Sequence, residues 1–137
     1  RAVVAVMLGV DTNVLVRYLV RDDEAQFEKA RKLIKREVAA GRRVFVSQLV
    51  LLETEWVLRS RYSLPKNLII EAISSLLDAT DVRLEDEQAI EEALFIWKDT
   101  PADFADCLIG AKNRRLGCRA TATFDAKASR LPGFIAA

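Results

Sequence analysis

The chain has 137 residues, of which 51% are hydrophobic and 30% charged, as in an ordinary globular protein. It contains no histidine, which excludes Ser-His and Cys-His nucleophile pairs, histidine general bases and almost every zinc-hydrolase ligand set. The 21 basic and 20 acidic residues leave a net charge of +1, a sum that neither indicates nor excludes a nucleic-acid partner. Any hydrolysis must therefore rest on carboxylates, and we expect a hard metal ion beside them.

The first half of the chain predicts two strands, each followed by helices. A buried strand is expected over residues 4–10, with helices over 14–20 and 24–40, the second ending at Gly41. A short β-rich run at 43–47 precedes helices over 48–61 and 66–79. Met7 is a candidate native start, which would make residues 1–6 an extension.

The second half predicts a strand over 82–84, a helix over 85–98, a helix from Thr100-Pro101 to about residue 116, and a strand over 119–124. Strands that alternate with helices indicate an α/β fold with a mainly parallel sheet. No repeat or linker divides the sequence, so we expect one domain over residues 1–137. No apolar run suggests a membrane span, and Cys107 and Cys118 are expected to be free thiols in the cytoplasm.

Two aspartates follow predicted strands. Asp11 ends the first strand and Asp125 follows the last. Ligands of open parallel sheets bind outside the carboxyl ends of the strands, so both positions suit a functional site. The alternative for each is a helix N-cap or an Asx-turn.

Glu53 has Leu49, Val50, Trp56 and Val57 as its neighbours at helical spacing. These apolar neighbours place Glu53 in the predicted buried stripe of its helix, where a carboxylate needs a partner or a metal ion. Glu55 has Arg59 four residues on, which predicts a surface ion pair.

Asp103 and Asp106 lie three residues apart on one helix face. Thr100 and Asp103 have capping-box spacing, and if the helix starts later, Asp103 caps it and Asp106 occupies its first turn. Taken together with Asp11, Glu53 and Asp125, these acids are typical of an oxygen-ligand site for Mg²⁺ or Mn²⁺.

Four segments of the chain carry these acids: DTNVLVRYL (11–19), LLETEWVLRSRY (51–62), DFADCLIGA (103–111) and TFD (123–125). They resemble, in order, the four acidic motifs of PIN-domain nucleases, and in particular the VapC-type ribonuclease toxins of toxin–antitoxin pairs. The resemblance implies a PIN-like three-layer α/β/α sandwich with a mainly parallel central sheet. It also implies cleavage of RNA with Mg²⁺ or Mn²⁺ as the cofactor.

The resemblance further assigns residues. Asp11, Glu53, Asp106 and Asp125 match the catalytic, metal-binding acids. Asn13 and Thr123 match polar positions that orient the carboxylates, and Asp103 matches an additional acid of this subgroup. The implied partners are an RNA substrate, a cognate VapB-type antitoxin and a second copy of the chain, with no membrane partner. The large apolar residues of 64–77 and around Phe95 also predict a subunit contact.

Other functions compete with this hypothesis. Haloacid-dehalogenase-type phosphatases need a second Asp two residues after the first, where this chain has Asn13. A housekeeping RNA-processing PIN nuclease and a non-catalytic interaction domain are further alternatives, the second disfavoured by the predicted burial of Glu53. Lys112, Arg114 and Arg115 either grip RNA phosphates or form a solvated helix face.

Overall fold

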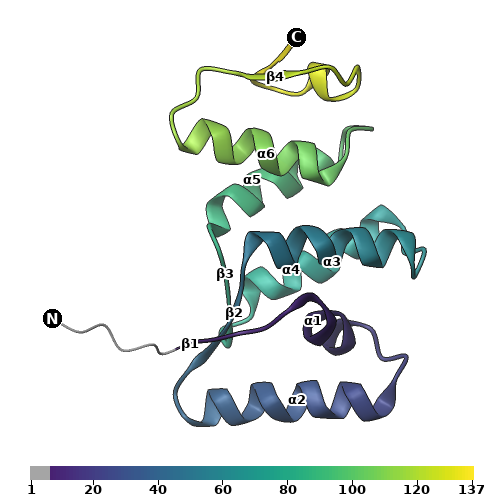
Figure 1. Cartoon of the computed structure of the whole chain (residues 1–137), viewed down its shortest axis with the longest axis vertical. Helices are drawn as coiled ribbons and strands as arrows, with labels where there is room; N and C mark the ends of the chain where they lie inside the picture. The colour runs from purple at the N-terminus through teal and green to yellow at the C-terminus, as the bar shows by residue number, and fades with distance from the viewer. Residues whose placement is uncertain (1–6) are drawn as a thin grey trace, which may run out of the picture. The chain divides into compact units, whose positions relative to one another are not determined.

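The computed structural model describes residues 7–137, so the predicted extension at 1–6 and the start of the first predicted strand lie outside the described residues. The chain forms two compact units, Arg1–Glu85 and Asp86–Ala137. Each unit has its own helices and its own parallel sheet, and Figure 1 labels the six α-helices and strands β1 to β4. The mixed α/β class with parallel strands is confirmed. The single domain stays a prediction.

The first unit contains β1 (Met7–Gly9), α1 (Thr12–Leu19), α2 (Glu24–Ala39), β2 (Arg43–Val46), α3 (Gln48–Ser60), α4 (Lys66–Asp78) and β3 (Val82–Leu84). Its three strands pair in parallel in the order β1-β2-β3. Gly9 lies beside Phe45 and Val46 beside Leu84, so the strands end at one edge of the sheet, where the loops to the next helices begin.

The core of the first unit forms where helices cover this sheet. Helix α2 packs against β2 and α4 against β3, while α1 contacts both α2 and α3. Ile34 of α2, Val44 and Val46 of β2, and Ile69 and Ile73 of α4 are buried. Burying such aliphatic side chains contributes about 1.5–3 kcal/mol each, which fixes the helices against the strands.

The second unit contains α5 (Glu87–Trp97), α6 (Phe104–Arg115), β4 (Thr121–Thr123), the 3-10 helix η1 (Ala128–Arg130) and β5 (Phe134–Ala136). Helices α5 and α6 pack together, with the ring centroids of Trp97 and Phe104 5.1 Å apart. Strand β5 and η1 were not predicted from the sequence. Strand β5 pairs in parallel with β4, and a Cβ at Gly110 of α6 would overlap the Phe134 ring. Gly110 therefore lets β5 approach α6 closely.

The predicted element boundaries agree with the structure within a few residues, except at the start of α6. That helix begins at Phe104 and not at Thr100. The Thr100 hydroxyl accepts a hydrogen bond from the Ala102 amide at 3.2 Å, which closes a short turn where the first helical residues were expected. Both cysteines are free, Cys107 buried and Cys118 exposed. Within residues 7–137, no helix is both long and apolar enough to cross a bilayer.

Candidate functional site

Asp11 lies beyond the end of β1 and caps α1. One of its carboxylate oxygens, Oδ1, accepts a hydrogen bond from the Val14 amide at 3.0 Å. The capping alternative is thus correct for Asp11. It does not remove Asp11 from a site, since an ionised carboxylate accepts several bonds and this one is exposed.

Glu53 of α3 is joined to the same place. The Thr12 hydroxyl, next to Asp11, donates a hydrogen bond to Glu53 Oε1 at 2.8 Å. Asp11, Thr12, Asn13 and Glu53 line one pocket of about 330 Å³ in the first unit. The structure therefore brings Asp11, Asn13 and Glu53 together. The sequence reasoning missed Thr12, and its position beside the first acid was the available signal.

The predicted environments of Glu53 and Glu55 were wrong. Glu53 is exposed, and so are its neighbours Leu49 (76%) and Trp56 (55%). Glu55 is buried at 3% exposure beside Leu51 and Leu58. The ion pair from Glu55 to Arg59 exists at 2.7 Å, but its acidic end is in the core. Both faces of α3 carry apolar residues at helical spacing, so periodicity alone selected the wrong one.

A cation borders the Glu53 pocket. Arg17 pairs with Asp22 at 3.1 Å, and its Nη1 also donates to the Tyr62 hydroxyl at 3.3 Å. Tyr62 donates in turn to Asp22 at 2.9 Å, and this hydrogen bond is the main cause of the lowered pKa of Asp22, to which Arg17 also contributes. The network fixes Arg17 in place at the border of the Glu53 pocket.

In the second unit, Asp103 and Asp106 lie at the start of α6. Asp103 occupies the N-cap position without a side-chain cap bond, and Asp106 is in the first turn. The capping-box prediction with Thr100 was therefore wrong, and the later helix start is correct. Burial raises the pKa of Asp106, and the negative charges of Asp103 and Asp125 raise it further. Asp106 is thus close enough to both of the other carboxylates to be repelled by them.

Asp125 follows β4 and closes a turn. Its Oδ1 accepts a hydrogen bond from the Ala128 amide at 2.8 Å, as the turn alternative predicted. Thr123 Oγ1 accepts from the Asp125 amide at 3.0 Å, so Thr123 fixes the main chain of Asp125. Asp103 and Asp125, with Lys127, line a pocket of about 270 Å³.

The basic end of α6 is bound within its own unit. Lys112 and Arg115 both pair with Asp86, at 3.2 and 2.8 Å, and Arg114 pairs with Glu92. Burial by itself raises the pKa of Asp86, but the hydrogen bonds from Arg115 and Lys112 outweigh it and hold that pKa below its usual range. These cations connect α6 to α5 and its N-cap, so they are neither a simple solvated face nor free to grip phosphate.

A divalent cation suits the chemistry of these donors. Carboxylate oxygens are the preferred ligands of Mg²⁺ and Mn²⁺, and the mutual repulsion around Asp106 is the kind that a cation relieves. Within the part of the chain that the structure describes, no three Asp, Glu or Cys side chains are gathered as closely as metal ligands require. The repelling carboxylates therefore interact through space without forming a ready coordination shell.

The chain is similar to several known proteins. The chain is 24% identical over 121 residues to a VapC ribonuclease of Aquifex aeolicus (strain VF5), covering 88% of this chain and 89% of that protein. A crystal structure of Mycobacterium tuberculosis VapC20, a Sarcin-Ricin loop cleaving toxin, matches 90% of this chain and 92% of its own, with 22% identity and a TM-score of 0.41. The crystal structure of Rickettsia felis VapBC2 bound to a promoter DNA fragment matches 96% of this chain and 97% of its own chain, with 15% identity and a TM-score of 0.38.

The family model for the PIN domain matches residues 9–133, a range that contains all the acidic residues described above. The chain belongs to the PIN-domain family.

Proposed function

We propose that this protein is a Mg²⁺- or Mn²⁺-dependent endoribonuclease and the toxin of a toxin–antitoxin pair. The observation that carries the proposal is the PIN match over residues 9–133, which includes every acidic motif of the sequence. The similarity to a VapC ribonuclease along most of the chain supports RNA as the substrate and a VapB-type protein as the antitoxin.

The proposed catalytic acids are Asp11, Glu53, Asp106 and Asp125. They would hold the metal ion, which when bound lowers the pKa of a water molecule and offsets charge on the scissile phosphate. Thr12 holds Glu53 through its hydroxyl, and the Val14 amide holds Asp11. These two hydrogen bonds fix both carboxylates before substrate arrives, which lowers the cost of assembling the site. Asp103 adds negative charge beside Asp106.

Histidine is not needed for this chemistry. The general base of many nucleases is a histidine, and this chain has none. Carboxylates with a divalent ion perform the same activation of water at neutral pH. The composition and the proposed activity are therefore consistent.

The direct test is cleavage of single-stranded RNA in Mg²⁺ or Mn²⁺ by the purified protein. Asp106→Asn should reduce the rate by about a hundredfold or more, because it removes one charged ligand while keeping the side-chain shape. The matched control is Asp99→Asn, at an exposed acid in the turn between α5 and α6. Equal rates for Asp106→Asn and the wild type would refute the site assignment.

The proposal also includes a homodimer and growth inhibition when the chain is expressed without its antitoxin. Several of the apolar residues that suggested a subunit contact are buried in the chain itself, including Ile69, Ile73 and Trp97. Leu68 (43% exposed) and Phe95 (70%) remain accessible for such a contact. Sedimentation at micromolar concentration tests the dimer, and a monomer there would remove this part of the proposal.

A further inference from the structure

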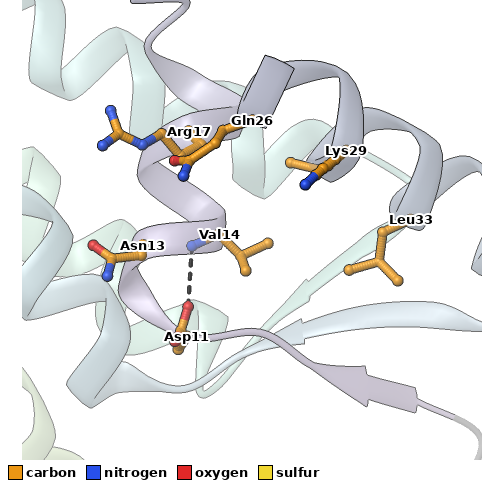
Figure 2. Close-up of a pocket in the computed structure, with 8 residues that line it drawn as sticks. Asp11, Asn13, Val14, Arg17, Gln26, Lys29 and Leu33 are labelled. Atoms are coloured by element: carbon orange, nitrogen blue, oxygen red, sulfur yellow. Dashed lines mark hydrogen bonds between the residues drawn. The ribbon is translucent and has the colours of Figure 1, made fainter. Parts of the chain in front are cut away.

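A second pocket adjoins Asp11, on the side where α1 faces α2. It has a volume of about 310 Å³, and Figure 2 shows it between the two helices. Asp11, Asn13 and Arg17 line both this pocket and the one that holds Glu53. The two pockets therefore meet at Asp11, one of the proposed catalytic acids.

The walls of this pocket, which we term the α1–α2 pocket, combine two kinds of side chain. Val14 and Leu33 form an apolar surface, and Gln26, Lys29 and Arg17 supply polar groups around it. Figure 2 shows Lys29 and Leu33 on the α2 side and Val14 on the α1 side. An apolar wall with a few polar groups beside it is the usual composition of a site for a small organic group.

One cation of the α1–α2 pocket is available to an anion. Lys29 and Arg17 both line the pocket beside Asp11, but the charge of Arg17 is matched by its ion pair with Asp22. Arg17 is held by Asp22 and Tyr62. Lys29 is exposed and, among residues 7–137, forms no ion pair with an acidic side chain. Its ammonium group is therefore available to a phosphate without first breaking a contact.

The size of the pocket limits the ligand. Ligand pockets span roughly 300–1,000 Å³, and about 310 Å³ lies at the small end of that range. One unpaired nucleotide fits such a volume, whereas a paired helix does not enter it. The amide of Gln26 offers both a donor and an acceptor, as reading the edge of a base requires.

We propose that the α1–α2 pocket receives the unpaired nucleotide next to the scissile phosphate. Its base lies against Val14 and Leu33 with its edge at Gln26, and Lys29 contacts its phosphate. This inference rests on the proposed function, because it takes RNA as the substrate. It makes the pocket a determinant of which nucleotide is accepted beside the cut.

Two substitutions and one control test the inference. Lys29→Glu reverses the phosphate-contacting charge, and Leu33→Trp fills the apolar end of the pocket. Lys35→Glu makes the same charge change on an exposed residue of α2 that does not line the pocket. Cleavage is measured on short single-stranded RNAs in which each position around the cut is varied. Affinity is measured by fluorescence anisotropy of the same RNAs on the Asp106→Asn background.

Lys29→Glu should lower kcat/KM and RNA affinity about tenfold for all sequences and reduce the slope of affinity against salt by about one. Leu33→Trp should change the preference at one position beside the cut. Lys35→Glu should match the wild type. The inference is overturned if the protein cleaves RNA and all three variants share its affinity and preference.

It is likewise overturned if the two pocket substitutions weaken only the binding of a protein partner. Absence of RNA cleavage by the wild type is a separate result that refutes the proposed function. In a protein that cleaves RNA, a loss of affinity or a changed preference confined to Lys29→Glu and Leu33→Trp supports the pocket assignment.

Discussion

The acidic residues of the two units are held in different ways. In the first unit, Asp11 and Glu53 each accept a hydrogen bond from a neutral donor, the Val14 amide and the Thr12 hydroxyl. In the second unit, Asp106 is partly buried, and Asp103 and Asp125 raise its pKa. The first pair is therefore positioned by hydrogen bonds, whereas Asp106 is repelled by the two acids beside it. Position and charge can thus be tested separately in this protein.

The largest expected effect separates these two properties at Asp11. Asp11→Asn keeps a good N-cap but removes the charge, so cleavage should fall by about a hundredfold or more while stability stays within about 0.5 kcal/mol of the wild type. Asp11→Ala should lose the same activity and also about 1 kcal/mol of stability, because the Val14 amide loses its partner. RNA cleavage and denaturant unfolding measure the two effects. Equal stability of both variants would show that the cap contributes nothing.

The next effect compares two acids two residues apart in α3. Glu55→Gln should destabilise the fold by about 1–3 kcal/mol, because it weakens an ion pair whose acidic end is buried. The half-exposed Arg59 keeps this cost below that of a fully buried pair. Glu53→Gln should leave stability nearly unchanged and reduce cleavage. Urea denaturation of both variants and an RNA cleavage assay measure these effects. A larger loss of stability in Glu53→Gln than in Glu55→Gln would support the original prediction that Glu53 is the buried acid.

The smallest effect is a pH dependence in the second unit. The raised pKa of Asp106 means that the folded state binds its proton more tightly than the unfolded chain does. The resulting stabilisation is complete below the unfolded-state pKa and is lost as pH rises through the folded-state pKa. At neutral pH, in metal-free buffer, Asp106→Asn should therefore raise stability, by less than about 1 kcal/mol since Asp106 is partly exposed to solvent.

Thermal unfolding of the wild type and Asp106→Asn across the acidic range checks this. The extra stability of Asp106→Asn over the wild type should shrink as pH falls through the range in which carboxyl groups titrate, since the wild-type side chain is then neutral as well. A gain of the same size at every pH would point to a packing effect of the amide. Asp99→Asn is again the control, and it should show no such pH dependence.

Much of the fold could be predicted because the hydrophobic periodicity and the positions of helix-ending and turn-forming residues agree in this sequence. Gly41 follows α2 and the strands at 43–46 and 82–84 were located closely. Strand β5 was missed since FIA, at Phe134–Ala136, is three residues long and pairs only through contacts with β4. The side of α3 that is buried was missed because Leu49 and Trp56 are as apolar as Leu51 and Leu58. Only tertiary contacts distinguish two such stripes.

The candidate site was predicted as a set of residues and not as a geometry. Asp11 at a strand end follows from the topology of parallel sheets. The bond from Thr12 to Glu53 joins residues far apart in the chain, and no local pattern encodes it. The pairing of Lys112 and Arg115 with Asp86 likewise depends on how α5 and α6 pack.

The short connection between β4 and β5 has a consequence for how the second unit folds. Parallel strands usually need a crossover of about a dozen residues or more, but here residues 124–133 suffice, with η1 between the strands. The hydrogen bond that Asp125 accepts from the Ala128 amide closes this connection. The Thr121 and Ala137 amides donate across the strand pair, to the carbonyls of Gly133 and Thr123. Closing so short a loop costs little chain entropy, so this strand pair can form early and locally. A residue proposed for catalysis would then also stabilise the turn on which this local strand pairing depends.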